Sequence, residues 1–283
     1  MPSPNLSAIL QSITNLRPMP GNVTRVLREI DKPNVSIDML VGLISLDQAL
    51  AALVLQLSNS VALGYSRKCT TLHEAIMHIG LSRLKSILLT SPATSILKRS
   101  LSGYRLGSGE LWHHSLVTGS TAEWLAQALR YPNPEEAYVS GLLHDMGKLV
   151  LDQFVLSNYN AIVEYVQRYH LPLWQVEEKL LGIDHAKVGG MIAQRWNFPV
   201  VLVDAIRFHH IPSFARSNQQ LPAIINLSNA FADAYQLKES ALLSFDIHPE
   251  TLNILRLDAD RIEKLKAGMQ ASGRFPEPTK GGR

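Results

Sequence analysis

Apolar residues recur three and four positions apart along most of the chain, which is the spacing of one face of an α-helix. The sequence has no segment in which apolar and polar residues alternate regularly, as in a strand, and no Asn-Gly or Asp-Gly turn. The pattern therefore predicts an all-α, multi-helical fold. Between residues 36 and 63 the helical spacing is followed by Leu40, Leu43, Ile44, Leu50, Leu53, Val54 and Leu57.

Polar residues mark where several of these helices should begin. Ser45 followed by Gln48, and Thr71 followed by Glu74, both have the form of a capping box. The segment 133–136 reads Asn-Pro-Glu-Glu, which places a cap, a proline at the first helical position and acids in the first turn. We therefore expect helices to start after each of these three positions.

Glycine and proline predict where helices break. Gly80 should end the helix that begins after Thr71, and Leu81–Ile96 should form a further helix that Pro92 interrupts. The segment 99–110 has three glycines, three serines and no periodic apolar face, which is typical of a boundary.

This boundary divides the chain into an N-terminal helical subdomain, residues 1–103, and a C-terminal helical domain, residues 104–271. The remaining residues, 272–283, are rich in proline and glycine, and we expect them to be disordered.

Composition narrows the class of protein. The chain has 283 residues, of which 46% are hydrophobic, enough to bury a core. The one cysteine, Cys69, excludes an internal disulfide and a cysteine-rich zinc site. No basic segment precedes an apolar core at the N-terminus, and the nearly apolar stretch 48–57 is far shorter than the roughly 20 residues of a membrane span. We therefore expect a soluble, cytoplasmic protein with no membrane partner.

The charge is distributed unevenly. Residues 1–105 carry 11 basic and 5 acidic residues, whereas residues 106–283 carry 16 basic and 19 acidic residues. The basic surplus is dispersed and forms no block of the density found in nucleic-acid patches. A scaffold that binds nucleic acid or a protein through the basic half is therefore the least favoured of the functions that the sequence allows.

Histidine is the residue in surplus, and seven of the ten histidines lie between His113 and His210. Imidazole and carboxylate groups are ligands of divalent ions such as zinc, iron, nickel and manganese. No local pair of histidines has the spacing of a zincin helix, so a metal site would have to be assembled from several helices, as in helix bundles.

The adjacent pair His144-Asp145 is the most informative, because it interrupts the apolar stretch 138–151. A buried, ionised aspartate costs several kcal/mol unless something pairs with it, and a metal ion would do so. Lys148, one helical turn after His144, is placed to neutralise Asp145 or to hold a phosphate oxygen. The alternative is that the pair only ends a helix before Gly147.

These motifs resemble those of a known family. The segment 142–148, Leu-Leu-His-Asp-Met-Gly-Lys, resembles the HD-x-G-K signature of the HD superfamily of metal-dependent phosphohydrolases, and the ordered set resembles one branch, the HDOD (HD-related output) domains. The resemblance extends from about Leu6 to Leu237. Its other elements are His114-Ser115 and the segments 184–189, 205–210, 17–20, 44–51, 57–60, 71–76 and 79–81.

The resemblance implies a set of metal ligands and a divalent ion, whether iron, nickel, manganese or zinc. Its last aspartate should fall where this chain has Asn229, which offers a neutral oxygen and no negative charge, so a dinuclear site would be weakened. The remaining positions that match ligands are His114, His144, Asp145, His185, His209 and His210.

The resemblance also implies a role. HDOD domains are in general bacterial signalling output modules, and the Gly-Tyr-Pro element of the HD-GYP branch is replaced here by Ile-Pro-Ser-Phe at 211–214. We therefore favour a regulatory output protein with signalling partners and a nucleotide or phosphate ligand. The alternative is a metal-dependent phosphohydrolase acting on a nucleotide or phosphodiester, with Lys148 as the catalytic residue that stabilises phosphate charge.

Two residues near these motifs receive no site role from the sequence. Glu177, eight residues before His185, fits a solvated helix face better than a role in orienting that histidine. Trp174 fits core packing. The histidines given no site role are His73, His78, His170 and His248.

Overall fold

The computed structural model describes residues 4–16, 19–59, 69–236 and 247–272. These residues form helices and contain no strand, only an isolated bridge between Leu101 and Leu106, which confirms the predicted all-α fold. The helices are α1 (Pro4–Thr14), α2 (Gly21–Ile30), α3 (Ile37–Ser45), α4 (Gln48–Ser58), α5 (Leu72–Leu97), α6 (Glu110–Ala128), α7 (Pro134–Leu143), α8 (Lys148–Ser157), α9 (Tyr159–Tyr169), α10 (Leu173–Leu181), α11 (His185–Arg195), α12 (Val200–Arg207), the short 3-10 helix η2 (Pro212–Phe214), α13 (Gln220–Gln236), α14 (Pro249–Leu255) and α15 (Ala259–Ala271). The segment 273–283, which was expected to be disordered, lies outside the described residues.

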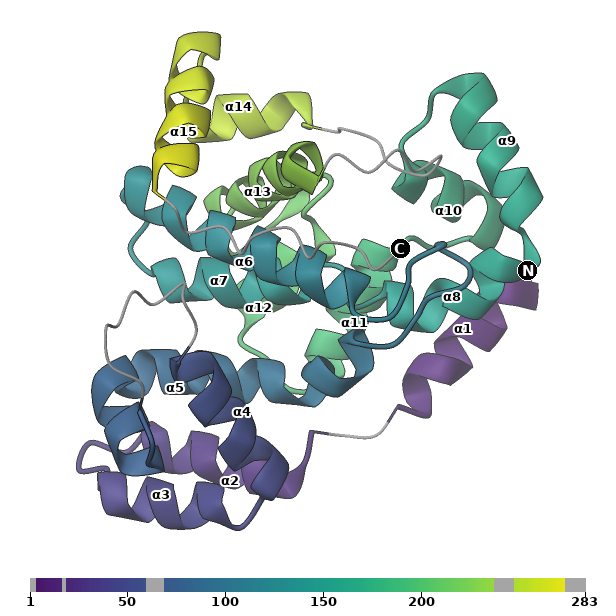
Figure 1. Ribbon diagram of the computed structural model, residues 1–283. Coiled ribbons are helices and arrows are strands. Elements are labelled where there is room, and N and C mark those ends of the chain that lie inside the picture. The colour runs from purple at the N-terminus through teal and green to yellow at the C-terminus, as the bar shows by residue number, and fades with distance from the viewer. Residues whose placement is uncertain (1–3, 17–18, 60–68, 237–246, 273–283) are drawn as a thin grey trace, which may run out of the picture.

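The helices form two groups that α5 connects (Figure 1). α2, α3, α4 and the first part of α5 surround one core, which includes Val26, Leu40 and Leu84. The second part of α5 contributes Leu89 and Leu97 to the core of the C-terminal helices. None of the helices in the described ranges is long and apolar enough to span a membrane.

The first helix packs with the C-terminal group, not with its neighbours in sequence. α1 lies beside α8 in Figure 1, and its buried residues Ile9 and Ile13 belong to the core shared by α8 and α11. The subdomain boundary between residues 103 and 104 stays a prediction. α1 precedes this boundary in sequence but packs with the helices that follow it.

α5 shows one predicted break and lacks another. Gly80 has a left-handed φ of 75°, where the helix is kinked, as predicted. Pro92 was expected to interrupt the following helix, but α5 continues through it with helical backbone angles to Leu97. The missing amide of Pro92 leaves the Leu88 carbonyl without its helical donor, and the Ser91 hydroxyl donates to this carbonyl at 2.8 Å instead.

The helix starts were predicted with mixed success. Thr71 caps α5 as predicted, since its hydroxyl accepts from the Glu74 amide at 3.1 Å. Ser45 does not cap α4, because α3 continues through it. Asp47 takes this role by accepting from the Leu50 amide at 3.0 Å, and its negative charge interacts favourably with the helix N-terminus.

The segment 99–110 is folded against the C-terminal helices. The Leu101–Leu106 bridge closes it with N···O distances of 2.9 and 3.0 Å. The Gly103 amide donates to Asp152 Oδ1 at 2.7 Å, and a Cβ atom at residue 103 would lie only 2.2 Å from the Asp152 carbonyl oxygen. This close approach to α8 buries the neighbouring Tyr104.

A largely buried ion pair joins the two groups of helices. Arg83 on α5 donates to both carboxylate oxygens of Glu123 on α6, at 2.6 and 2.8 Å. The same guanidinium lies 4.6 Å from the ring centroid of Tyr138 on α7. Both charged side chains are 15% exposed, so water screens the pair weakly.

We expect Glu123→Gln to destabilise the fold strongly. The change leaves a largely buried guanidinium without its carboxylate, a loss that costs about 3 kcal/mol. Urea unfolding followed by circular dichroism measures the free energy of unfolding. The exposed Lys32–Glu29 pair provides the control, since Lys32→Gln should cost about 0.5 kcal/mol or less. Equally small losses in both variants would contradict a structural role for the Arg83–Glu123 pair.

Candidate metal centre

The residues that the sequence proposed for the site lie together where several helices meet. His114 comes from α6 and Asn229 from α13, while His185 is the first residue of α11. The turn between α7 and α8 supplies His144 and Asp145, Lys148 is the first residue of α8, and the turn after α12 supplies His209 and His210. All eight positions are thus gathered in one buried region.

The turn that carries His144 and Asp145 depends on a close backbone contact. α7 starts at Pro134 and ends at Leu143, so the pair follows a helix and does not lie within one. A Cβ atom at Gly147 would lie 1.9 Å from the His185 carbonyl oxygen and 2.7 Å from the Gly189 amide nitrogen. Only glycine permits this approach of the α7–α8 turn to α11. The glycine of the motif therefore brings Asp145 next to His185.

Asp145 lies at the centre of the cluster and is 2% exposed. Its Oδ2 accepts from Lys148 Nζ at 2.6 Å and lies 3.4 Å from His144 Nε2 and 3.7 Å from His114 Nε2. Its Oδ1 lies 3.2 Å from His185 Nε2. Burial alone would raise the pKa of Asp145, but its interactions with His144 and with the Lys148 ammonium hold it well below its usual range.

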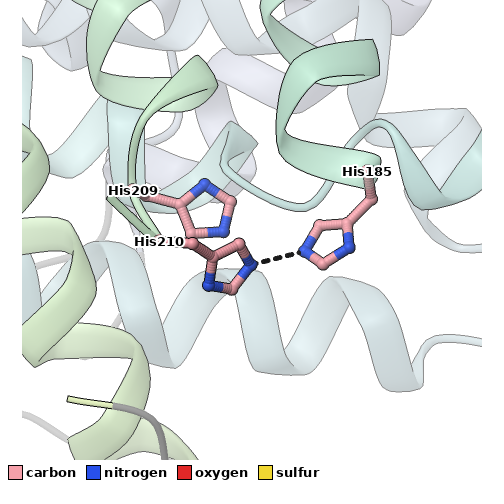
Figure 2. Close-up of side chains that lie close together, drawn as sticks. All are labelled: His185, His209 and His210. Carbon is pink, nitrogen blue, oxygen red and sulfur yellow. Dashed lines mark hydrogen bonds between the residues drawn. The ribbon is translucent and has the colours of Figure 1, made fainter. Parts of the chain in front are cut away.

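The ligand atoms fall into two sets of three that adjoin at Asp145. In each set they lie within 4.8 Å of one another. One set is His185, His209 and His210, shown in Figure 2, where His210 Nε2 lies 2.9 Å from His185 Nε2. The other is His114, His144 and Asp145.

Two of the imidazoles are held by backbone carbonyls. His144 Nδ1–H donates to the Gly141 carbonyl and His209 Nδ1–H to the Ile206 carbonyl, both at 2.8 Å. These bonds fix the tautomer, so that each Nε2 presents a lone pair. Both Nε2 atoms are buried and have no hydrogen-bond partner among the described residues. A metal ion would satisfy two acceptors that are otherwise costly to bury, so these residues fit a metal.

Glu177 was expected on a solvated helix face, and that expectation is wrong. Its side chain is 0% exposed, and its Oε2 accepts from His185 Nδ1 at 2.6 Å and from the His185 amide at 2.8 Å. Its Oε1 accepts from the Tyr104 hydroxyl at 2.7 Å. The sequence held a signal for this, because Glu177 lies four residues from both Leu173 and Leu181 on the buried face of α10.

Trp174 was assigned to the core, but it also contacts the site. Its indole stacks on the His210 ring with centroids 5.5 Å apart and planes inclined by 12°. Burial lowers the pKa of His210 well below its usual value, and the neighbouring His209 and His185 lower it further. The neutral imidazole that results is the form that binds metals.

α13 contributes two residues beside His114: Asn229, which the sequence singled out, and Asp233, which it did not. Asn229 Oδ1 accepts from His114 Nε2–H at 2.9 Å. Asp233, one turn later on the same helix face, lies 3.6 Å from His114 Nδ1 and is 7% exposed. Burial raises the pKa of Asp233 to about 7, and burial lowers that of His114 to about 3. The spacing of four residues between Asn229 and Asp233 was the available signal.

Comparison with known proteins gives a family match and similar structures. The model of the HDOD domain family matches residues 16–212. An uncharacterised protein of Treponema pallidum is 28% identical over 247 residues, which are 84% of this chain and 47% of that protein. The chain therefore spans about half the length of this curated relative.

Two solved structures resemble the whole fold. An HDOD domain protein from Geobacter sulfurreducens has a TM-score of 0.74 and 25% identity, with 95% of this chain and 93% of that chain covered. A proposed phosphohydrolase from Shewanella amazonensis has a TM-score of 0.71 and 22% identity, with 95% of each chain covered. The second likeness concerns the fold alone.

We expect Gly147→Ala to destabilise the protein by about 3 kcal/mol or more, because its methyl group would overlap backbone atoms that cannot move aside. Gly42→Ala is the matched control, since nothing lies within 4 Å of its added Cβ atom. In an exposed position of α3 it should raise stability by about 0.5–1 kcal/mol. Thermal and urea unfolding would measure the free energy of unfolding of both variants. A Gly147→Ala variant as stable as wild type would contradict the close contact between the α7–α8 turn and α11.

Proposed function

The chain belongs to the HDOD domain family, and on this premise we propose that it is a signalling output protein that binds a divalent metal ion at the His/Asp centre. The observation that carries the proposal is the pair of buried, unpartnered Nε2 atoms of His144 and His209, both directed at the cluster around Asp145. Their tautomers are set by backbone carbonyls, so the centre is organised for a ligand with empty orbitals.

Imidazole predominates among the residues that would hold the ion, which suits iron, nickel or zinc, and Asp145 adds the carboxylate that manganese prefers. When bound, such an ion supplies positive charge to a cluster that has a single central carboxylate, and the Lewis acidity that phosphoryl chemistry requires. The proposed ligands are His114, His144, Asp145, His185, His209 and His210.

The closure of the centre supports a regulatory role over turnover. His144 and His209 are 0% exposed, and Asp145 and His185 are 2% exposed. Lys148 Nζ donates to Asp145 at 2.6 Å. A catalytic role would require the same ammonium group to contact a phosphate. A phosphodiester would have to displace this ion pair before reaching the cluster. Asn229 adds no negative charge to compensate a second ion.

The alternative is a metal-dependent phosphohydrolase acting on a nucleotide or phosphodiester. One observation favours it: the two sets of ligand atoms meet at Asp145, whose two oxygens face different sets. Lys148, whose side chain is 17% exposed, would turn from Asp145 to the phosphate and stabilise its charge.

We expect the purified chain to retain a divalent metal and His144→Ala to lose it. The substitution removes an inward lone pair from the buried cluster, so bound metal should fall at least tenfold in elemental analysis. The control is His73→Gln, on a histidine whose side chain is 54% exposed and which is remote in sequence from every proposed ligand. Equal metal content in the two variants would contradict the assignment of the centre.

We expect the metal-loaded chain to show no hydrolysis of nucleotides or of bis(4-nitrophenyl) phosphate above that of the free metal. The measurement is product release at saturating metal, with wild type and His144→Ala compared. Metal-dependent turnover that His144→Ala abolishes would replace the signalling proposal with the phosphohydrolase.

A further inference from the structure

The acidic residue on α13 that has no role in the proposal above is Asp233. Asn229 and Asp233 are four residues apart on α13 and lie at opposite edges of the His114 ring. Asn229 Oδ1 is 2.9 Å from Nε2, and Asp233 Oδ1 is 3.6 Å from Nδ1. The imidazole is therefore bracketed by an amide on the side of the metal centre and a carboxylate on the side away from it.

The other histidines show what the second edge of the ring needs. The Nδ1 atoms of His144 and His209 donate to carbonyls at 2.8 Å, and that of His185 donates to Glu177 at 2.6 Å. Each of these bonds places a proton on Nδ1, and in the neutral form of the ring Nε2 then carries a lone pair. His114 differs from these three, because its Nε2 is occupied by the proton donated to Asn229.

His114 can turn its Nε2 lone pair toward the centre only if its proton moves to Nδ1. Such a move transfers one proton between two atoms of the same ring and leaves the net charge unchanged. It needs an acceptor beside Nδ1, and Asp233 Oδ1 is the acceptor that the described structure offers there. Asp233 is 7% exposed, and His114 supplies its only ion pair among the described residues.

We propose that Asp233 is a positioning residue, which accepts from His114 Nδ1–H when the centre is loaded and so releases the Nε2 lone pair from Asn229 to the metal. This inference rests on the proposed metal site. Under this proposal the carboxylate that α13 contributes to the centre is Asp233, one helical turn after Asn229.

The test is metal affinity, measured by calorimetric titration of Zn²⁺ or Mn²⁺ into the metal-free full chain. Asp233→Asn should weaken binding by 10- to 100-fold, as the loss of an outer carboxylate commonly does. Asp233→Asn keeps a neutral acceptor oxygen and loses only the charge, whereas Asp233→Glu keeps the charged carboxylate and should remain within a few fold of wild type. The matched control is Asp204→Asn, which alters a buried aspartate that accepts from the Ser217 amide at 2.9 Å and should leave affinity unchanged.

A second readout reports the tautomer directly. Nitrogen-15 NMR of the histidine rings in the Zn²⁺-loaded chain should place the His114 proton on Nδ1, and in the metal-free chain on Nε2. A His114 proton that stays on Nε2 in the loaded chain would overturn the proposal.

The outcomes separate this inference from the function on which it rests. A wild-type chain that binds neither ion removes the metal site itself. Wild-type binding with unchanged affinity in Asp233→Asn keeps the site and overturns the role of Asp233. Equal losses in Asp233→Asn and Asp233→Glu would show that packing, and not the carboxylate, is what α13 requires, which also overturns it.

Discussion

The carboxylate of Asp145 is held out of water among groups that come from three separate parts of the fold. A buried charge of this kind is tolerated only with close compensation, and here Lys148 provides a full positive charge at 2.6 Å while His144, His114 and His185 converge on the same two oxygens. Asp145 therefore lies where the N-terminal parts of α6, α8 and α11 meet. Gly147 makes that meeting sterically feasible, because its missing side chain lets the α7–α8 turn approach α11.

Contacts with groups outside the cluster orient four of its histidines. Backbone carbonyls orient His144 and His209, a glutamate tied to Tyr104 orients His185, and the Trp174 indole stacks on His210. Tyr104 reaches Glu177 only because the segment 99–110 folds back onto α8. The contacts that hold ligand orientation thus extend into a stretch whose composition suggested a linker, and the precision of the centre depends on a loop outside the motifs.

The sequence predicted the fold class and singled out histidines that the fold gathers in one cluster, because helical periodicity and the HD motif are local patterns. It did not predict that Pro92 is accommodated, since the compensating Ser91 hydroxyl acts only once a helix exists. Glu177 was misjudged because a charged residue is usually solvated, although its spacing from Leu173 and Leu181 places it on the buried face of α10. Asp233 was missed because its relation to His114 arises from two helices more than a hundred residues apart.

The attachment of α1 has a mechanical consequence. α2, α3 and α4 are flanked by two helices, α1 and the second part of α5, and both are anchored in the core of the C-terminal helices. α1 rests on the same two helices, α8 and α11, whose N-terminal ends carry Lys148 and His185, so a force applied to α1 is borne by the helices that support the centre.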